Sequence, residues 1–264
     1  MKPVTITTLR ELKQAGQKIT CLTAYDYSFA SLLDRAGLDA IMVGDSLGMT
    51  MQGHASTLPV SIDDMAYHCA CVARGVTRAL IIGDMPFGSY QVSPEQAFEN
   101  AAILMQAGAQ VVKLEGGAPM VETVRFLVER GIPVCAHLGL TPQSVHQLGG
   151  YRVQGREAEA AQRLRDDAKR LQAAGASLLV LEAVPAALAK VISAELAIPT
   201  IGIGAGPDAD GQVLVLQDML GLYPRPSPKF SRNFMQGAES IEAAVKTYVE
   251  AVRSKTFPGP EHSY

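Results

Sequence analysis

Acidic and basic side chains stand at the ends of several short apolar runs, and their types and spacing predict chemistry. These residues are Asp45, Asp84, Glu115, Glu182 and His137. A single acid at such a position is more often a helix cap or a turn residue. Four carboxylates gathered in one place, however, repel each other and are costly to desolvate unless a cation lies among them. The acids therefore predict a bound cation in addition to the nearby Lys113.

The predicted cation is Mg²⁺. Asp and Glu supply oxygen ligands, and the His and Cys sets of a zinc site do not accompany them. Because Mg²⁺ uses few protein ligands, a 2-oxo acid could chelate it through carboxylate and keto oxygens. The metal would then stabilise the enolate that forms when the neighbouring carbon loses a proton. A carboxylate that is not a metal ligand, Glu182, would act as the base. The residues alone do not identify the electrophile with which the enolate would react.

The segments that position these residues alternate between β-branched apolar runs and helical spacing. The expected strands are Ile19–Thr23, Ala40–Val43, Ala79–Ile82, Val111–Leu114, Pro133–Ala136, Leu178–Leu181, Pro199–Ile203 and Val213–Leu216. The expected helices are Tyr27–Ala36, Ile62–Arg74, Pro94–Ala107, Met120–Arg130, Glu157–Ala174, Ala186–Leu196 and Ile241–Ser254. Glycine follows several of these helices, where a left-handed residue ends the helix.

This pattern predicts an α/β fold, a (β/α)8 TIM barrel that forms a single domain over residues 1–264, with a doubly wound open sheet as the alternative. The eighth unit is the least regular, because only about ten residues separate Ile203 from Val213. In a parallel barrel the carboxyl ends of all strands open onto one face, so the four acids and the histidine would meet there. Lys113 and Glu115 are two residues apart in one strand and would point to the same side.

Three long connections rich in glycine and proline are expected to be functional loops or lids. They are Ser46–Ser61, Gly139–Gly155 and Gly221–Gln236. The series Gly202, Gly204 and Gly206 is not a dinucleotide fingerprint, because Pro207 takes the place of the third glycine. Close backbone approach at the barrel mouth explains these glycines, with a phosphate site after the seventh strand as the alternative.

Composition narrows the range of partners. Charged residues make up 19% of the 264 residues and the net charge is −3, so we expect neither nucleic acid nor a membrane as a partner. The four cysteines lack C-x-x-C spacing and no segment has the apolar length of a membrane span, so we expect a cytoplasmic protein with reduced thiols. The low charged fraction also predicts that other subunits cover part of the surface in a homo-oligomer.

Several long motifs resemble those of the 3-methyl-2-oxobutanoate hydroxymethyltransferase (ketopantoate hydroxymethyltransferase) family. They include VGDSLGM at 43–49, VKLEGG at 112–117, HLGLTPQS at 137–144 and IGIGAG at 201–206. The similarity extends over essentially the whole chain. It implies a Mg²⁺-dependent barrel enzyme of pantothenate biosynthesis that forms homodecamers. Such an enzyme transfers a hydroxymethyl group from 5,10-methylenetetrahydrofolate to 3-methyl-2-oxobutanoate and produces 2-dehydropantoate.

The resemblance also implies roles for individual residues, which follow from motif position. Asp45 and Asp84 resemble metal ligands that also contact the oxo acid, and Glu115 lies in or next to the metal shell. Ser46 and Lys113 resemble contacts to the oxo acid, and His137 matches a substrate-facing histidine. Glu182 resembles the general base of the family. The resemblance assigns no residue to the folate.

Two other functions remain as alternatives. A Mg²⁺-dependent carbon–carbon lyase or aldolase that acts on another 2-oxo acid could use the same four acids, and dependence on folate separates it from the transferase. A non-catalytic protein that binds a metal or an oxo acid would need ligands but no additional acid. Glu182 would then have no role, so the sequence favours an enzyme.

Overall fold

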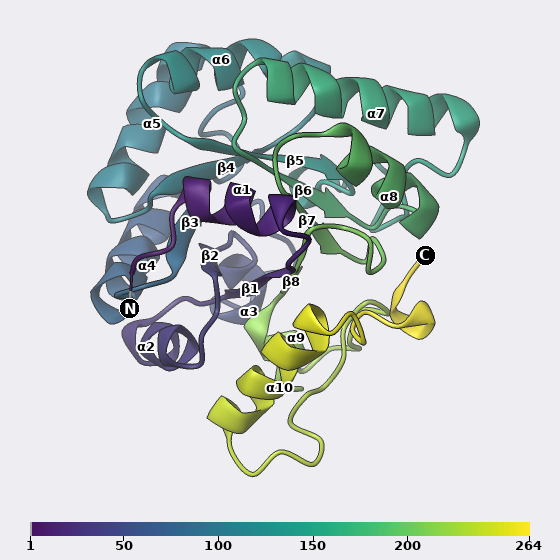
Figure 1. Ribbon diagram of the computed structural model, residues 1–264. Helices are drawn as coiled ribbons and strands as arrows, with labels where there is room; N and C mark the ends of the chain where they lie inside the picture. The colour runs from purple at the N-terminus through teal and green to yellow at the C-terminus, as the bar shows by residue number, and fades with distance from the viewer. Residues whose placement is uncertain (1) are drawn as a thin grey trace.

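The computed structural model describes residues 2–264, and eight strands form a closed parallel barrel (Figure 1). The strands are β1 Ile19–Thr23, β2 Ala40–Val43, β3 Leu80–Asp84, β4 Val111–Glu115, β5 Val134–Gly139, β6 Leu178–Glu182, β7 Thr200–Ile203 and β8 Gly211–Leu214. Each strand pairs with the next one in chain order, and β8 closes the ring by pairing with β1, with Ile19 opposite Gly211. The predicted (β/α)8 barrel is confirmed, and the open sheet is excluded.

Helices surround this ring, as Figure 1 shows for α4 to α8. The helices are α1 Ile6–Gln14, α2 Tyr27–Arg35, α3 Leu47–Thr50, α4 Ile62–Gly75, α5 Pro94–Gln106, α6 Val121–Glu129, α7 Ala158–Ala173, α8 Ala186–Glu195, α9 Leu216–Met219 and α10 Ile241–Arg253, with short 3₁₀ turns η1 Ala118–Met120, η2 Pro142–Ser144 and η3 Pro260–His262. All seven predicted helices are present with ends within one residue of the prediction. The described connection between β7 and β8 contains no helix, as its short length required.

The prediction missed α1 and α3, the latter within the connection Ser46–Ser61, and it misplaced the boundary between β8 and α9. The eighth strand ends at Leu214, and Leu216 instead begins α9, where its backbone N–H donates a hydrogen bond to Thr23 Oγ1 at 3.0 Å. Helix α1 was not predicted. It begins at a capping box formed by Thr5 and Thr8, and it buries Leu9 completely against the inner side chains of the barrel.

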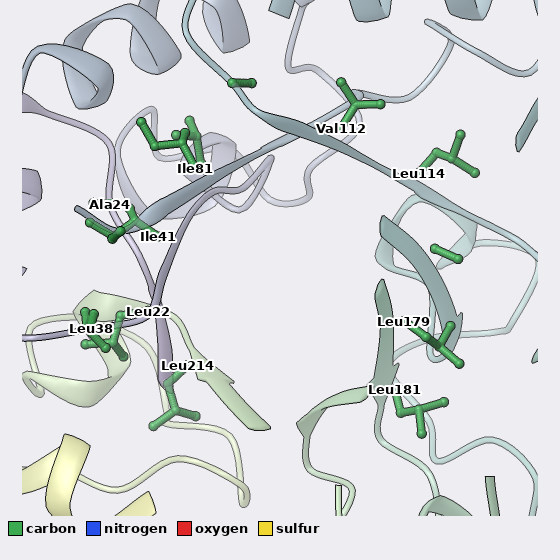
Figure 2. Packing of buried hydrophobic residues seen from close by; sticks show 14 of the residues in the cluster. Leu22, Ala24, Leu38, Ile41, Ile81, Val112, Leu114, Leu179, Leu181 and Leu214 are labelled. Carbon is green, nitrogen blue, oxygen red and sulfur yellow. The ribbon is translucent and has the colours of Figure 1, made fainter. Parts of the chain in front are cut away.

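Side chains alternate along each strand between the inside of the barrel and the helices. An inner apolar cluster is formed by every second strand residue, such as Leu80 and Ile82 in β3, or Leu178 and Val180 in β6. The intervening strand residues form a larger cluster with the helices, and Figure 2 shows these side chains pointing away from the barrel centre. They include Leu22, Ile41, Ile81, Val112, Leu114, Leu179, Leu181 and Leu214.

The same alternation carries polar residues into the barrel mouth. The inner series continues from Ile82 to Asp84 in β3, from Val111 through Lys113 to Glu115 in β4, from Cys135 to His137 in β5, and from Val180 to Glu182 in β6. Each inner series is therefore apolar at its beginning and polar at its carboxyl end. This explains why the apolar core and the candidate site share one barrel interior.

Two further findings concern the cysteines and the apolar length of the helices. All four cysteines are free thiols, and three of them are buried. None of the helices within residues 2–264 combines the length and the apolar character that crossing a bilayer demands.

Candidate active site at the carboxyl ends of the strands

A cavity of about 860 Å³ opens at the carboxyl ends of the strands. Its volume is in the range of small-molecule sites. All seven residues predicted for the site line it, namely Asp45, Ser46, Asp84, Lys113, Glu115, His137 and Glu182. The three long connections also contribute lining residues, represented by Thr57, Tyr151 and Tyr223. These loops therefore border the candidate site, and their function as lids stays a prediction.

Lys113 is a buried cation with carboxylates on two sides. Its Nζ lies 3.1 Å from Asp84 Oδ2 and 3.8 Å from Glu115 Oε1, and all three side chains are almost completely buried. Burial lowers the pKa of Lys113, but the surrounding carboxylates outweigh burial and raise it well above its ordinary value. Lys113 is therefore a permanent cation, available to hold an anionic substrate group.

His137 lies between two carboxylates. Its Nδ1 is 3.3 Å from Glu115 Oε1, and its Nε2 is 3.3 Å from Glu182 Oε2. Burial and the charge of Lys113 lower the pKa of His137, yet Glu115 and Glu182 outweigh them and raise it to about 9. The imidazolium is thus the stable form at neutral pH, and it links the acid predicted near the metal to the predicted base.

Asp45 lies just beyond β2, and its backbone forms a hydrogen bond with the side chain of Asp84. The Asp45 N–H donates to Asp84 Oδ2 at 3.2 Å. Burial, together with the charges of Asp84 and Glu115, raises the pKa of Asp45 to about 7. Gly44 makes this approach possible, because a Cβ at that position would lie 2.8 Å from Ser46 Oγ and 3.4 Å from Asp84 Oδ2. The absence of a side chain at Gly44 brings β2 and β3 together at the mouth.

Gln143 connects several residues of the site by hydrogen bonds, and the sequence did not predict this role. From η2, its Nε2 donates to Asp45 Oδ2 at 2.9 Å, and its backbone N–H donates to Glu115 Oε2 at 3.1 Å. The Tyr90 hydroxyl in turn donates to Gln143 Oε1 at 2.6 Å. Gln143 stands within the 137–144 motif, but its residue type alone gave no signal of this role. Tyr25 was missed likewise, and its hydroxyl lies 2.8 Å from Ser46 Oγ.

The residues of the mouth fit a divalent cation. Asp84 Oδ1 is buried without a hydrogen-bond partner, and Glu115 Oε1 has only its ion pairs with His137 and Lys113. Asp84, Glu115 and Glu182, with Asp45 partly ionised at neutral pH, face the two cations Lys113 and protonated His137, so negative charge is in excess around these side chains. Among residues 2–264, no group of three or more His, Cys, Asp or Glu side chains is placed to hold a metal ion, so fewer than three of them would ligate it as they stand. Mg²⁺ tolerates such a site, because it usually takes one or two carboxylates and fills its shell with water or substrate oxygens.

The glycines after β7 have a packing role. A Cβ at Gly204 would lie 2.9 Å from Phe230 Cδ1, and one at Gly206 would lie 2.5 Å from Ala186 Cβ. Gly204 thereby lets Phe230 approach the cavity that it lines. Close approach at the barrel mouth is confirmed as the reason for these glycines, and the phosphate site stays a prediction.

Asp218 is an additional cavity residue that the sequence did not reveal. It lies in α9, is 6% exposed, and its Oδ1 has no hydrogen-bond partner. Burial raises the pKa of Asp218 from 3.8 to about 6. A raised pKa stabilises the folded protein below pH 4, and this stability is lost as the pH rises through 6. The ionised side chain at pH 8 is thus a cost to the fold, on the order of 1–3 kcal/mol.

We therefore expect Asp218→Asn to stabilise the protein more at pH 8 than at pH 4. The gain in Tm over the wild type should be larger at pH 8 by roughly 2–6 °C, measured without metal. Asp208→Asn removes an exposed acid and serves as the control, with Tm changes under about 1 °C at either pH. An equal gain for Asp218→Asn at both pH values would contradict the raised pKa.

A parallel barrel whose buried acids and bases converge at the carboxyl ends of its strands belongs to the class of barrel enzymes. The sequence model of the family described as "Ketopantoate hydroxymethyltransferase" matches residues 3–260. The chain belongs to this family.

Named relatives agree with this assignment over nearly full length. The 3-methyl-2-oxobutanoate hydroxymethyltransferase of Methylobacillus flagellatus is 67% identical over 97% of this chain and 98% of its own. The protein of the same name from Thiobacillus denitrificans is 64% identical over 99% of this chain and 100% of its own.

Solved structures show the same fold at low sequence identity. A putative phosphonomutase from Burkholderia cenocepacia has a TM-score of 0.65 at 17% identity, covering 82% of this chain and 94% of its own. A 2,3-dimethylmalate lyase of the PEP mutase/isocitrate lyase superfamily has a TM-score of 0.57 at 18% identity, covering 79% of this chain and 80% of its own. These likenesses concern the fold alone.

Proposed function

We propose that this protein transfers a hydroxymethyl group from 5,10-methylenetetrahydrofolate to 3-methyl-2-oxobutanoate and produces 2-dehydropantoate, with Mg²⁺ as cofactor. The names of the relatives support this reaction. The observation that carries the proposal is the convergence of Asp84, Lys113 and Glu182 in one cavity. The site thus combines metal-ligand chemistry, a cation for the substrate carboxylate, and a separate carboxylate base.

Asp45, Asp84 and Glu115 would hold the Mg²⁺. The buried, unpartnered oxygen Asp84 Oδ1 supports this assignment. When bound, the ion supplies Lewis-acid stabilisation for negative charge that develops on the substrate's keto oxygen.

The side chains divide the remaining work. Lys113 and Ser46 bind and orient the oxo acid. Glu182 takes the proton from C3, and the C–H electron pair becomes the enolate double bond between C3 and C2. C3 then forms a bond to the methylene carbon of the folate as one of its two C–N bonds breaks. A water molecule replaces the other C–N bond and supplies the hydroxyl, and tetrahydrofolate leaves with two protons on its nitrogens, one from Glu182 and one from the water. His137 positions Glu182, because its Nε2 lies 3.3 Å from Glu182 Oε2.

The direct test uses the purified protein with Mg²⁺, 3-methyl-2-oxobutanoate and 5,10-methylenetetrahydrofolate. We expect 2-dehydropantoate and tetrahydrofolate in equal amounts by mass spectrometry, loss of activity with EDTA, and recovery with added Mg²⁺. Formation of product from free formaldehyde at the full rate, without any response to the folate, would instead support the lyase or aldolase. Full activity in EDTA would contradict the metal assignment.

The proposal extends to a cytoplasmic homo-oligomer, a decamer by family resemblance. Large apolar side chains exposed on the α4 and α5 side support an interface between copies, including Tyr67 at 67% and Val92 at 80% exposure. Light scattering of the full chain tests this, and a monomer at micromolar concentration would contradict it.

A further inference from the structure

The cavity contains two groups of buried polar atoms without hydrogen-bond partners. The catalytic group comprises Asp84 Oδ1, together with Glu115 Oε1 and His137 Nε2, which have ion-pair contacts only, at 3.3 Å, with His137 Nδ1 and Glu182 Oε2. The second group comprises Thr57 Oγ1, Asp218 Oδ1 and the Tyr223 hydroxyl. Buried polar atoms of this kind destabilise a fold unless ordered water or a ligand supplies the partner, so those that line a cavity are candidate ligand contacts. The proposed metal and oxo acid account for the catalytic group and leave the second one unexplained.

Two members of the second group lie across the mouth from Lys113 and Glu115 of β4. Asp218 and Tyr223 follow β8, which is four strands away from β4 in the closed ring. Thr57 belongs to the same side through α3: a Cβ on Gly48 would lie 3.7 Å from Thr57 Cα, and Met51 Sδ lies 3.7 Å from Gln217 Nε2, the neighbour of Asp218. A ligand at this second group therefore faces an oxo acid held by Lys113.

The chemistry of Asp218 selects the kind of ligand. An ionised carboxylate only accepts hydrogen bonds, so its partner must present N–H or O–H donors. The oxo acid has no such donors, and its own carboxylate would be repelled by Asp218. An amino-substituted pyrimidinone ring presents an amino group beside a ring N–H, which matches a carboxylate. Hydroxyls such as those of Thr57 and Tyr223 can serve its remaining nitrogens and carbonyl.

The rim of the same cavity carries three exposed arginines, Arg152, Arg156 and Arg225. Within the described residues 2–264, none of the three forms an ion pair. The other loop cations, Lys229 and Arg232, do not line the cavity; Lys229 lies over the Tyr264 ring and Arg232 over the Phe234 ring. The ligand that fits this rim has an anionic tail in addition to its heterocycle.

We propose that Asp218, with Thr57 and Tyr223, binds the amino-pyrimidinone end of the one-carbon donor, and that the rim arginines bind its carboxylate tail. This inference rests on the proposed function, because it takes the folate as the donor. It adds the location of the donor: the heterocycle is held opposite Lys113, so that the methylene carbon is presented to C3 of the oxo acid from the β8 side.

The test measures binding by anaerobic calorimetry in the presence of Mg²⁺ and 3-methyl-2-oxobutanoate. The probes are tetrahydrofolate and 6-methyltetrahydropterin, which has the heterocycle without the tail. Asp218→Asn should raise the Kd for both probes about 10–100-fold. The triple variant Arg152→Gln, Arg156→Gln and Arg225→Gln should raise the Kd for tetrahydrofolate about tenfold and leave that for the tetrahydropterin unchanged.

Two controls keep the test decisive. Asp208→Asn, outside the cavity lining, should bind both probes like the wild type. Tyr223→Phe removes one hydroxyl and should raise the Kd for both probes about threefold to tenfold. This variant tests the subsite independently of Asp218→Asn. If the wild type binds tetrahydrofolate and Asp218→Asn binds it equally well, the subsite is wrong and the donor stands. If the wild type binds neither probe and transfers nothing from the folate, the proposed donor itself is wrong.

Discussion

Replacing Glu182 by Gln should slow the exchange of the C3 proton of 3-methyl-2-oxobutanoate with solvent deuterium by about 10²–10⁴-fold. Gln keeps the size of the side chain and removes the oxygen that accepts the proton. The metal would still be bound, because Asp45, Asp84 and Glu115 are unchanged. NMR follows the exchange directly with Mg²⁺ present and no folate. This readout isolates proton removal from carbon–carbon bond formation.

Glu159→Gln is the matched control for this experiment. Glu159 lies in α7 on the outer face, with an 87% exposed side chain paired to Arg163. The same change there should leave exchange within about twofold of the wild type. A Glu182→Gln protein that is folded by its Tm, binds Mg²⁺ and still exchanges at the wild-type rate would place the base elsewhere.

The second large effect is expected at Lys113, where loss of the charge should destabilise the fold as well as stop the reaction. Lys113→Met keeps the apolar stem but leaves Asp84 and Glu115 without their buried cation. Breaking one partner of a buried ion pair costs about 3–5 kcal/mol. We expect a loss of this size in the free energy of unfolding at pH 8, measured by denaturant titration in EDTA.

Two comparison proteins identify the cause of that loss. Lys190→Met removes a cation from an exposed pair with Asp208 and should cost under about 1 kcal/mol. Asp84→Asn combined with Lys113→Met removes both charges and should be more stable than Lys113→Met alone. A Lys113→Met protein as stable as the wild type would show that Lys113 does not balance these acids.

Local periodicity was sufficient to predict most of the barrel. The alternation of apolar residues in β3 and β6 determines which face each side chain takes, and it extends to Asp84 and Glu182. The same rule places Lys113 and Glu115 on one side of β4. The direction of a side chain along a strand is a local property, because successive side chains point to opposite faces. A sequence with this alternation therefore already specifies that these groups point into the mouth.

Two elements were predicted less well. Helix α1 has a local signal, the capping box of Thr5 and Thr8, that the prediction did not use, and it is further stabilised by burying Leu9 against the inside of the barrel. Leu216 continued an apolar run in the sequence, but its N–H donates to Thr23 of β1, and this long-range contact begins α9 instead. At Leu216 the tertiary contact outweighed the local pattern.

The sequence by itself determined the order of strands and helices, the inward direction of Asp84, Lys113, Glu115, His137 and Glu182, and the excess of carboxylates that calls for a cation. Which groups meet across the mouth depends on the closed barrel. Gln143 reaches Asp45 across 98 positions of the chain, and Asp218 is buried opposite Lys113 without a partner. The physical reason is that side-chain direction follows from the pleat of one strand, whereas contacts between loops depend on closure of the whole ring.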